Sequence, residues 1–283
     1  KPLDQIIGSN THRHLRDSIV DGTYRYCNNQ QCAWLLDKKN PTGWRQDAPE
    51  RIIRHLRLAI DDSCNLRCPS CRKGLIFHKE GSAYDLGMRL ADRINEWLYD
   101  YPHPLQVHIG SDGDPFASHV YRHFMEQTPE RDNIKYSVLT NGLMFKEFHT
   151  RVPYVMENMQ ELGVSIDGAS RETYEKLRLG GRWDKILESL ESISQQKQKH
   201  NFRFILHFVV QKANYHEMED IIALGRQYGA DRVYLNRITD WQTFADFNWH
   251  DVVSPAHPEH KRFQDKFETI KTNDSFVEYP TLE

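Results

Sequence analysis

Long apolar runs are missing from this sequence. No stretch approaches the roughly 20 apolar residues of a membrane-spanning helix, and the first residues, KPLDQIIGSNTHRHLRD, lack the apolar core of a signal peptide. Long runs of Lys or Arg are also missing, and the formal net charge is −3, which argues against a surface that follows nucleic-acid phosphates. We therefore expect a soluble, cytoplasmic protein without a membrane or nucleic-acid partner. Because the sequence starts without Met, we expect it to be a trimmed chain.

Cysteine is scarce. There are five cysteines, grouped as Cys27 and Cys32 and then as Cys64, Cys68 and Cys71. A secreted disulfide framework normally has an even number of cysteines, spread along the chain. We therefore expect reduced thiolates that bind a metal.

The composition is that of a folded α/β protein. With 283 residues, of which 39% are hydrophobic, the chain can bury the core of one large domain. After Cys71, short β-rich runs alternate with longer helical patterns, which is typical of a parallel sheet. Six strands joined by crossovers predict a partial (β/α)6 barrel, similar to a TIM barrel, with its chemistry at the carboxyl ends of the strands. The predicted strands are 55–60, 105–110, 134–140, 162–167, 202–210 and 231–236, and the predicted helical regions are 84–100, 172–199 and 215–229.

The two ends of the sequence do not follow this alternation. Residues 1–50 are polar and are interrupted by Pro41 and Gly43, which predicts a small N-terminal extension and linker. Residues 51–240 form the predicted barrel. Residues 241–283 contain a helical pattern but no further clear strand, and we expect them to pack on the barrel. Their aromatic segment WQTFADFNW either packs there or closes over a substrate.

The segment LAIDDSCNLRCPSC places Cys64, Cys68 and Cys71 directly after the first predicted strand, with the spacing C-x3-C-x2-C. Three thiolates bind three irons of a 4Fe-4S cluster, whereas a fully ligated cluster takes four. The fourth iron would stay open for a chelating group such as the amino and carboxylate groups of methionine. On spacing alone, a zinc site with His78 as the fourth ligand is the alternative.

Three further motifs follow the next predicted strands: GSDGDPF, LTNG, and SIDGAS with YEKLRLGG downstream. Asn-Gly and Asp-Gly are ordinary turn formers, so each motif alone indicates only a loop. Their joint occurrence in this order, downstream of the cysteine triplet, resembles the radical SAM superfamily from about residue 54 to 238. The resemblance implies that a 4Fe-4S cluster and S-adenosylmethionine are the cofactors.

The resemblance also implies roles for single residues. Gly113 and Asp114 match the positions that hold the methionine amino group, with Asp in place of the usual Glu and therefore one methylene less reach. The other implied S-adenosylmethionine contacts are Asn141 near the cofactor, Ser165 and Arg178 at the methionine carboxylate, and Asp167 near the ribose or the substrate. Arg suits a carboxylate because its planar fork binds both oxygens. Ser70 stands where an aromatic residue often packs on adenine. Asn214 matches a further pattern or is a plain helix N-cap.

Cys27 and Cys32 lie in a segment that resembles the tail of a SPASM domain, the cluster-binding extension of many peptide-modifying members. The segment precedes the barrel, which suggests a fusion. Two cysteines are too few for a second cluster ligated by cysteine alone. The alternatives are a zinc or weaker metal site completed by His12 or His14, and a degenerate remnant with buried thiols.

The resemblance implies an enzyme that cleaves S-adenosylmethionine reductively to a 5′-deoxyadenosyl radical, which abstracts hydrogen from a substrate. The SIDGAS and LRLGG motifs favour a peptide or protein side chain, and a carbohydrate or small metabolite is the alternative. A flavodoxin or ferredoxin is the implied electron donor. From other classes, a zinc-stabilised binding module and a non-catalytic Fe-S protein stay open.

Overall fold

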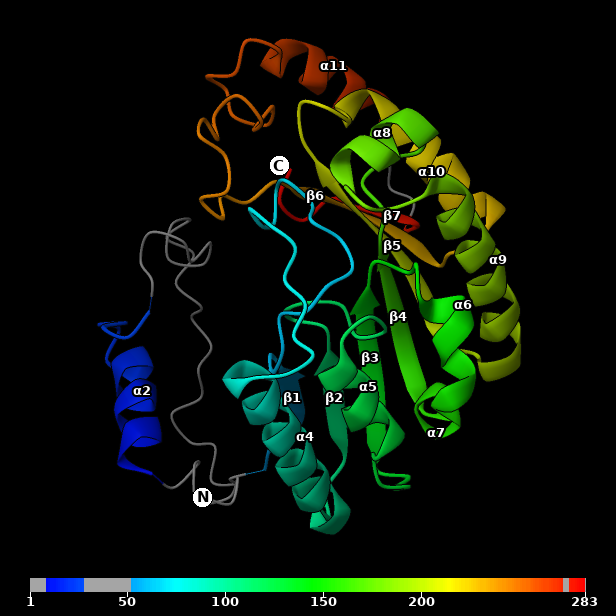
Figure 1. Cartoon of the computed structure of the whole chain (residues 1–283). Helices are drawn as coiled ribbons and strands as arrows, with labels where there is room; N and C mark the ends of the chain where they lie inside the picture. Colours follow the sequence, from blue (N-terminus) through cyan, green and yellow to red (C-terminus); the bar gives the residue numbers. More distant parts are fainter. Residues whose placement is uncertain (1–8, 28–51, 272–274, 283) are drawn as a thin grey trace.

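The structure, a computed structural model, describes residues 9–27, 52–271 and 275–282. In this part of the chain, seven parallel strands form one sheet in sequence order, and β1 and β7 are its two edges (Figure 1). The sheet is curved and open, so the fold is a partial barrel, as the sequence predicted. The strands are β1 His55–Leu58, β2 Leu105–Ile109, β3 Ile134–Thr140, β4 Met159–Ser165, β5 Arg203–Val210, β6 Arg232–Arg237 and β7 Val277–Glu278.

The seventh strand corrects the sequence prediction, which placed no strand in residues 241–283. β7 has only two residues and is defined by its pairing with β6. The N–H of Val233 in β6 donates to the carbonyl of Phe276, just before β7, at 2.8 Å. A strand this short carries no periodicity that a sequence pattern could reveal. The C-terminal extension therefore extends the sheet as well as packing on it.

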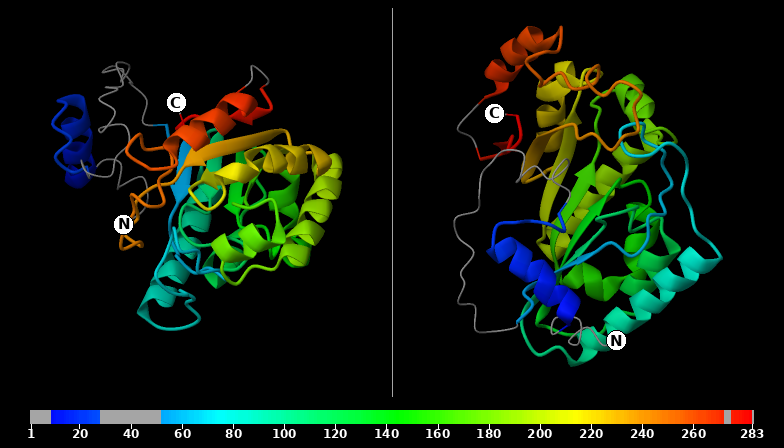
Figure 2. Two further views of the ribbon diagram at one scale, coloured as in Figure 1. Left: turned by 90° about the horizontal axis from the view of Figure 1, so that it is seen from above. Right: turned by 90° about the vertical axis from the view of Figure 1, so that its left-hand side faces the viewer.

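Helices cover the convex face of the sheet (Figures 1 and 2). The predicted helical regions are present, and the break between α8 and α9 falls at Gly180 and Gly181. α5 and the short segments between β3 and β4 were not predicted. The helices after β1 are α4 Ser82–Asp100, α5 His119–Glu126, α6 Phe145–Phe148, η1 His149–Arg151, α7 Pro153–Glu157, α8 Arg171–Leu177, α9 Trp183–His200, η2 Tyr215–Glu217, α10 Met218–Gln227 and α11 His260–Ile270.

Strand alternation divides the residues between the two faces. Side chains that point toward the helices, such as Val107, Val164 and Phe208, are fully buried and form the core. Their neighbours on the concave face include Arg57, His108 and further polar residues. Arg57 is exposed and His108 is only partly buried, so this face is not part of the packed core.

The N-terminal region contains one described helix, α2 Asn10–Val20, which lies to the side of the sheet on its β1 side (Figures 1 and 2). Among the described helices, none combines the length and the apolar character needed to cross a membrane.

Candidate functional site

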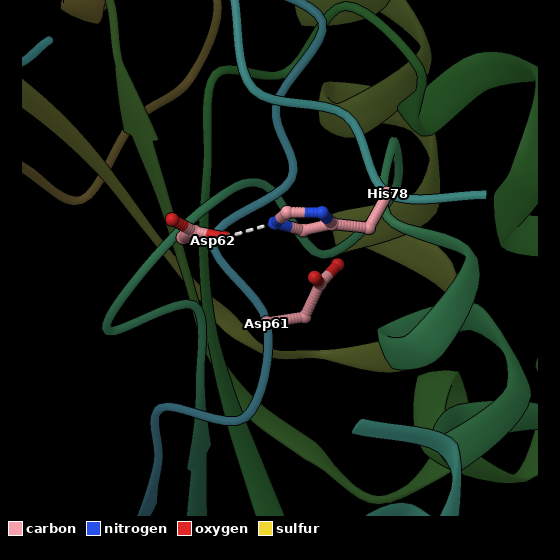
Figure 3. A group of neighbouring side chains, drawn as sticks. All are labelled: Asp61, Asp62 and His78. Carbon is pink, nitrogen blue, oxygen red and sulfur yellow. Dashed lines mark hydrogen bonds and ion pairs between the residues drawn. The ribbon is translucent and has the colours of Figure 1, made fainter. Parts of the chain in front are cut away.

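The three clustered cysteines lie on a long loop between β1 and α4, which extends beyond the carboxyl ends of β1 and β2 (Figure 1). Two hydrogen bonds join the beginning of this loop to its end. The backbone N–H of Cys64 donates to the carbonyl of Ile76 at 2.9 Å, and that of His78 donates to Oγ of Ser63 at 2.8 Å. The imidazole of His78 lies 2.8 Å from the carboxylate of Asp62 (Figure 3). We call residues 63–79 the cysteine loop.

The loop is anchored to the GDPF motif after β2. The N–H of Asp114 donates to the carbonyl of Ser63 at 2.8 Å. Gly113 has φ +67°, and a Cβ at this position would lie 2.5 Å from the same carbonyl oxygen, so only glycine allows this approach. Asp61, buried at the base, accepts hydrogen bonds from the hydroxyls of Ser63 and Ser118. The two motifs therefore form one unit although they are some fifty residues apart.

The thiols of Cys64 and Cys68 are buried, whereas Cys71 is exposed. The N–H groups of Cys71 and Arg72 both donate to the carbonyl of Cys68, which forms the turn that carries the second and third cysteines. Burial raises the pKa of Cys64 to about 11. A hydrogen-bond donor lies near this sulfur atom, because Nδ2 of Asn141 is 3.6 Å from Sγ of Cys64.

The geometry does not support the zinc alternative. Thiolates that bind one zinc ion at about 2.3 Å lie about 3.8 Å apart. Within the described residues, the single set of three His, Cys, Asp or Glu ligand atoms within 4.8 Å of one another is Asp61, Asp62 and His78 (Figure 3), and no cysteine belongs to it. His78 faces carboxylates and so is not a fourth ligand for the thiols. A four-iron cluster binds each thiolate at a different iron, so it does not need the three sulfur atoms this close together.

The side chain of Asp114 is buried, and both of its carboxylate oxygens accept hydrogen bonds from neighbouring residues. Its Oδ2 accepts from Oγ1 of Thr140 and the N–H of Asn141, each at 2.7 Å. Its Oδ1 accepts from the N–H groups of Phe116 and Ala117 at 3.1 and 3.0 Å. Burial raises the pKa of Asp114, and these bonds oppose the shift. The carboxylate therefore joins the loops after β2 and β3, and its predicted contact with the methionine amino group stays a prediction.

Arg178, which follows α8, is buried beside the cysteine loop. Its Nη2 lies 2.8 Å from Oδ2 of Asp167, and its Nη1 lies 3.8 Å from Sγ of Cys68. Its Nε is buried and has no hydrogen-bond partner among the described residues. A buried polar group without a partner calls for an explanation, and an unused donor beside the cysteines fits a bound carboxylate.

Asp167 occupies the left-handed region with φ +52°, and its Oδ1 accepts from the N–H of Val209 at 2.8 Å. Asn214 supports this turn. Its Nδ2 donates to the carbonyls of Asp167 and Val209 at 3.0 and 2.9 Å, and it makes no side-chain cap bond to the following helix. Asn214 therefore stands at the N-cap position of η2, as one of the two interpretations expected, but its side chain supports the turn at Asp167. Nearby, the carboxylate of Glu217 accepts from the hydroxyls of Ser170 and Thr173 at 2.6 Å each.

Two predicted residues make no side-chain hydrogen bond in the described part of the chain. Ser70 lies half-buried in the turn between the second and third cysteines. Ser165 is the last residue of β4, also half-buried, and pairs in register with His207 of β5. Both roles stay predictions.

The concave face contains a cavity of about 280 Å³, which extends to Gly110 and Ser111 at the end of β2. Its polar lining includes Arg57, His108 and His207. A Cβ at Gly163 would lie 2.8 Å from Nε2 of His207, so the imidazole lies across the glycine backbone. Burial and the charge of Arg178 lower the pKa of His207 to about 4, so this ring is neutral near pH 7.

Comparison with known proteins identifies the family. The model of the radical SAM superfamily matches residues 37–225, more than half of the chain. The chain belongs to the radical SAM superfamily. The cofactors of the family, a 4Fe-4S cluster and S-adenosylmethionine, are therefore the cofactors of this chain, and the thiols, Arg178 and the loop anchors fit them.

Curated relatives of this radical SAM chain are distant. A probable GTP 3′,8-cyclase of Methanococcus maripaludis is 25% identical over 52% of this chain and 47% of its own length. The GTP 3′,8-cyclase of Synechocystis is 24% identical over 64% and 53%. A tungsten-containing aldehyde ferredoxin oxidoreductase cofactor-modifying protein of Pyrococcus furiosus is 22% identical over 66% and 52%. The chain thus spans about half the length of the curated relatives it matches.

Among solved structures, Streptococcus suis SuiB bound to the precursor peptide SuiA matches 81% of this chain and 49% of its own, with a TM-score of 0.52 and 13% identity. At this identity the match supports the fold alone.

Sequence reasoning did not identify Arg72 and His207 as site residues. Arg72 follows the third cysteine directly, and its charge acts on all three cysteines. Its position beside the triplet was a usable signal. His207 has no motif around it, and only the register of β4 and β5 places its ring over Gly163.

The second cysteine pair is only partly described. Cys27 is exposed, which contradicts the prediction of a buried thiol at this position, and Cys32 lies outside the described residues. Among the described side chains, Cys27 does not join His12 or His14 in a set of three ligand atoms. A metal site formed by Cys27 and Cys32 stays a prediction.

Proposed function

We propose that this chain is an enzyme that cleaves S-adenosylmethionine reductively at a 4Fe-4S cluster bound by Cys64, Cys68 and Cys71. When bound, the cluster supplies one electron to S-adenosylmethionine, which yields methionine and a 5′-deoxyadenosyl radical that abstracts hydrogen from a substrate. The observation that carries the proposal is the buried guanidinium of Arg178, with an unused Nε and with Nη1 3.8 Å from Sγ of Cys68.

The residues around the cluster have distinct tasks in this proposal. The thiolates bind three irons, and the cations Arg72 and Arg178 favour the thiolate form because opposite charge lowers a thiol pKa. Nε of Arg178 donates to the methionine carboxylate. The enclosed carboxylates of Asp114 and Asp167 hold the loops in position, and Gly113, Asn141, Ser165 and Ser70 are proposed cofactor contacts.

We propose that the substrate binds in the cavity of the concave face, which extends to the carboxyl end of β2. The SIDGAS and LRLGG motifs favour a peptide or protein side chain. A small phosphorylated metabolite is the second candidate. It is supported by the guanidinium of Arg57, which lines the cavity and has no ion-pair partner among the described residues, and by relatives that are GTP 3′,8-cyclases.

The decisive test is anaerobic iron and sulfide analysis combined with electron paramagnetic resonance of the reduced protein, with and without S-adenosylmethionine. We expect about four irons per chain and a spectrum that changes when S-adenosylmethionine is added. Cys68→Ala should lose the iron, whereas Cys27→Ala, a matched change at an exposed cysteine outside the barrel, should retain it. Zinc in place of iron, or a spectrum indifferent to S-adenosylmethionine, would favour the binding module or the non-catalytic Fe-S protein.

A further inference from the structure

The hydroxyl of Tyr174, a residue of α8, has no hydrogen-bond partner among the described residues, although the side chain is completely buried. Buried tyrosine hydroxyls are normally bonded, because an unpaired buried donor costs free energy. The other two described tyrosines with no exposed surface are bonded. Oη of Tyr121 donates to the carbonyl of Leu58 at 3.1 Å, and Oη of Tyr136 lies 2.7 Å from Oγ1 of Thr128. Tyr174 therefore calls for an explanation.

The hydroxyl lies against the turn that follows α8, and this turn is bonded to the cysteine loop. The carbonyl of Leu179 in the turn accepts from the N–H of Arg67 in the cysteine loop at 3.0 Å. A Cβ at Gly181 would lie 3.0 Å from Oη of Tyr174, so the backbone of the turn packs on the hydroxyl. Because glycine has no side chain, this close neighbour offers no side-chain partner. The unpaired donor is thus located where the end of α8 meets the segment that carries the cysteines.

A second donor without a partner among the described residues, Nε of Arg178, is four residues further along. The N–H of Arg178 donates to the carbonyl of Tyr174 at 2.8 Å, which closes the last helical turn and places both side chains on one face. Burial raises the pKa of Tyr174, and the charge of Arg178 opposes the shift. The hydroxyl therefore keeps its proton near pH 7 and is available as a donor. Negative charges that act on it include those of Cys68 and Asp167, so it belongs to the site described above.

We propose that Tyr174 is a further residue that holds S-adenosylmethionine, with its hydroxyl donating to the methionine carboxylate alongside Nε of Arg178. A carboxylate accepts up to about four hydrogen bonds, so it satisfies both donors and leaves room for the expected contact of Ser165. The inference rests on the proposed function, because it adds a donor to the cofactor site of that function. Tyr174 binds and orients the methionine end of the cofactor, and it exchanges no proton or electron with it.

The contacts of Arg178 show why a second donor is needed. Its Nη2 lies 2.8 Å from the carboxylate of Asp167, and its Nη1 lies 3.8 Å from Sγ of Cys68. Nε is the one nitrogen of the guanidinium without an acceptor. A single N–H bonds one carboxylate oxygen, so the other oxygen needs a donor from elsewhere in the chain. The neutral hydroxyl of Tyr174 supplies this donor without adding a charge to the interior.

Tyr174→Phe tests the proposal, because it removes the hydroxyl and leaves the ring in place. Tyr136→Phe is the matched control: it removes the same group from another completely buried tyrosine, whose hydroxyl is bonded to Thr128. The denaturation midpoint is measured for the metal-free proteins. Anaerobic equilibrium binding to the iron-loaded proteins is then measured with S-adenosylmethionine and with decarboxylated S-adenosylmethionine, which lacks only the carboxylate, and each variant is compared with the wild type.

In the metal-free protein, Tyr174→Phe should leave the midpoint unchanged or raise it, because the group removed is an unpaired hydroxyl, whereas Tyr136→Phe should lower it. In the iron-loaded protein, Tyr174→Phe should weaken binding of S-adenosylmethionine about tenfold and binding of the decarboxylated form by less than about twofold. Tyr136→Phe should change either affinity by less than about twofold, because its hydroxyl is bonded elsewhere in the core.

A lower midpoint of metal-free Tyr174→Phe would overturn the proposal, because it would mean that the hydroxyl is bonded before any cofactor binds. An unchanged affinity for S-adenosylmethionine would overturn it as well, and so would equal losses with the two ligands, which would place the contact away from the carboxylate. A wild-type chain that loads no iron or does not bind S-adenosylmethionine would contradict the proposed function, and the inference would fall with it. The wild type thus tests the function, and the variant tests Tyr174.

Discussion

Nη1 of Arg178 lies 3.8 Å from Sγ of Cys68 in the interior of the protein. The two residues are 110 positions apart in the chain, and the contact brings the loop after the first strand together with the helix after the fourth. The same guanidinium pairs with Asp167 at 2.8 Å. A cation is thus held between a carboxylate and a thiol, where it can balance the charge of both.

Arg178→Lys should separate cofactor binding from cluster binding. Lysine retains the charge next to Asp167 but lacks the planar fork and Nε, so we expect iron content near the wild-type level and about tenfold weaker binding of S-adenosylmethionine. Equilibrium binding of S-adenosylmethionine to the iron-loaded protein measures the change. Arg171→Lys, at an exposed arginine that is also ion-paired, is the control. Unchanged affinity in Arg178→Lys would contradict the assigned role.

Gly113→Ala should damage the cysteine loop. The new Cβ would lie 2.5 Å from the carbonyl oxygen of Ser63, and φ is +67°. We expect a loss of about 2–4 kcal/mol in the free energy of unfolding together with reduced iron loading. Gly229→Ala has nearly the same φ, +69°, but its closest contact is Oγ of Ser194 at 3.5 Å, so it should cost only about 1 kcal/mol and leave iron loading intact. Equal effects of the two changes would show that steric contact with the loop is not the cause.

Asn214→Asp should loosen the turn at Asp167. The amide nitrogen of Asn214 donates to two carbonyls, and a carboxylate oxygen in its place would face both as an acceptor. Because the residue is completely buried, we expect a loss of about 2–4 kcal/mol in the free energy of unfolding, measured by denaturant titration. The exposed Asn201→Asp should cost less than about 1 kcal/mol. A small effect at Asn214 would mean that the turn does not depend on these bonds.

His207 should contribute to the acid sensitivity of the fold. Its pKa is about 4 in the folded protein, below the ordinary value of 6.5, so between these values the unfolded chain binds a proton that the folded chain does not. The free energy of unfolding therefore falls as the pH decreases from 6.5 to 4, by up to about 3 kcal/mol from this residue. His207→Gln should remove this part of the pH dependence and leave stability above pH 7 little changed. Denaturant titrations of the metal-free protein from pH 4 to 8 measure it, with the exposed His216→Gln as control. Identical pH profiles for wild type and His207→Gln would contradict the lowered pKa.

The cysteine triplet illustrates how far the sequence reaches. Its spacing predicted three ligands of an open-iron cluster. The family match confirms a 4Fe-4S cluster as a cofactor, and the assignment of the three cysteines as its ligands stays a prediction. The choice against zinc with His78 needed coordinates, because both ligand sets are compatible with the spacing. In the fold, the imidazole of His78 is directed to Asp62. The spacing of residues along the chain limits how close they can come, whereas the loop conformation decides which of them are in contact.

The sequence by itself determined the six long strands, the turns that follow them and the residue types at the site, because these features depend on local periodicity and on turn chemistry within a few residues. Only the tertiary structure decided the short seventh strand, the four donors around Asp114, the support of Asp167 by Asn214 and the position of His207 over Gly163. Each of these depends on partners brought together by strand pairing across long separations. Parallel strands align such residues through a register that no single segment encodes.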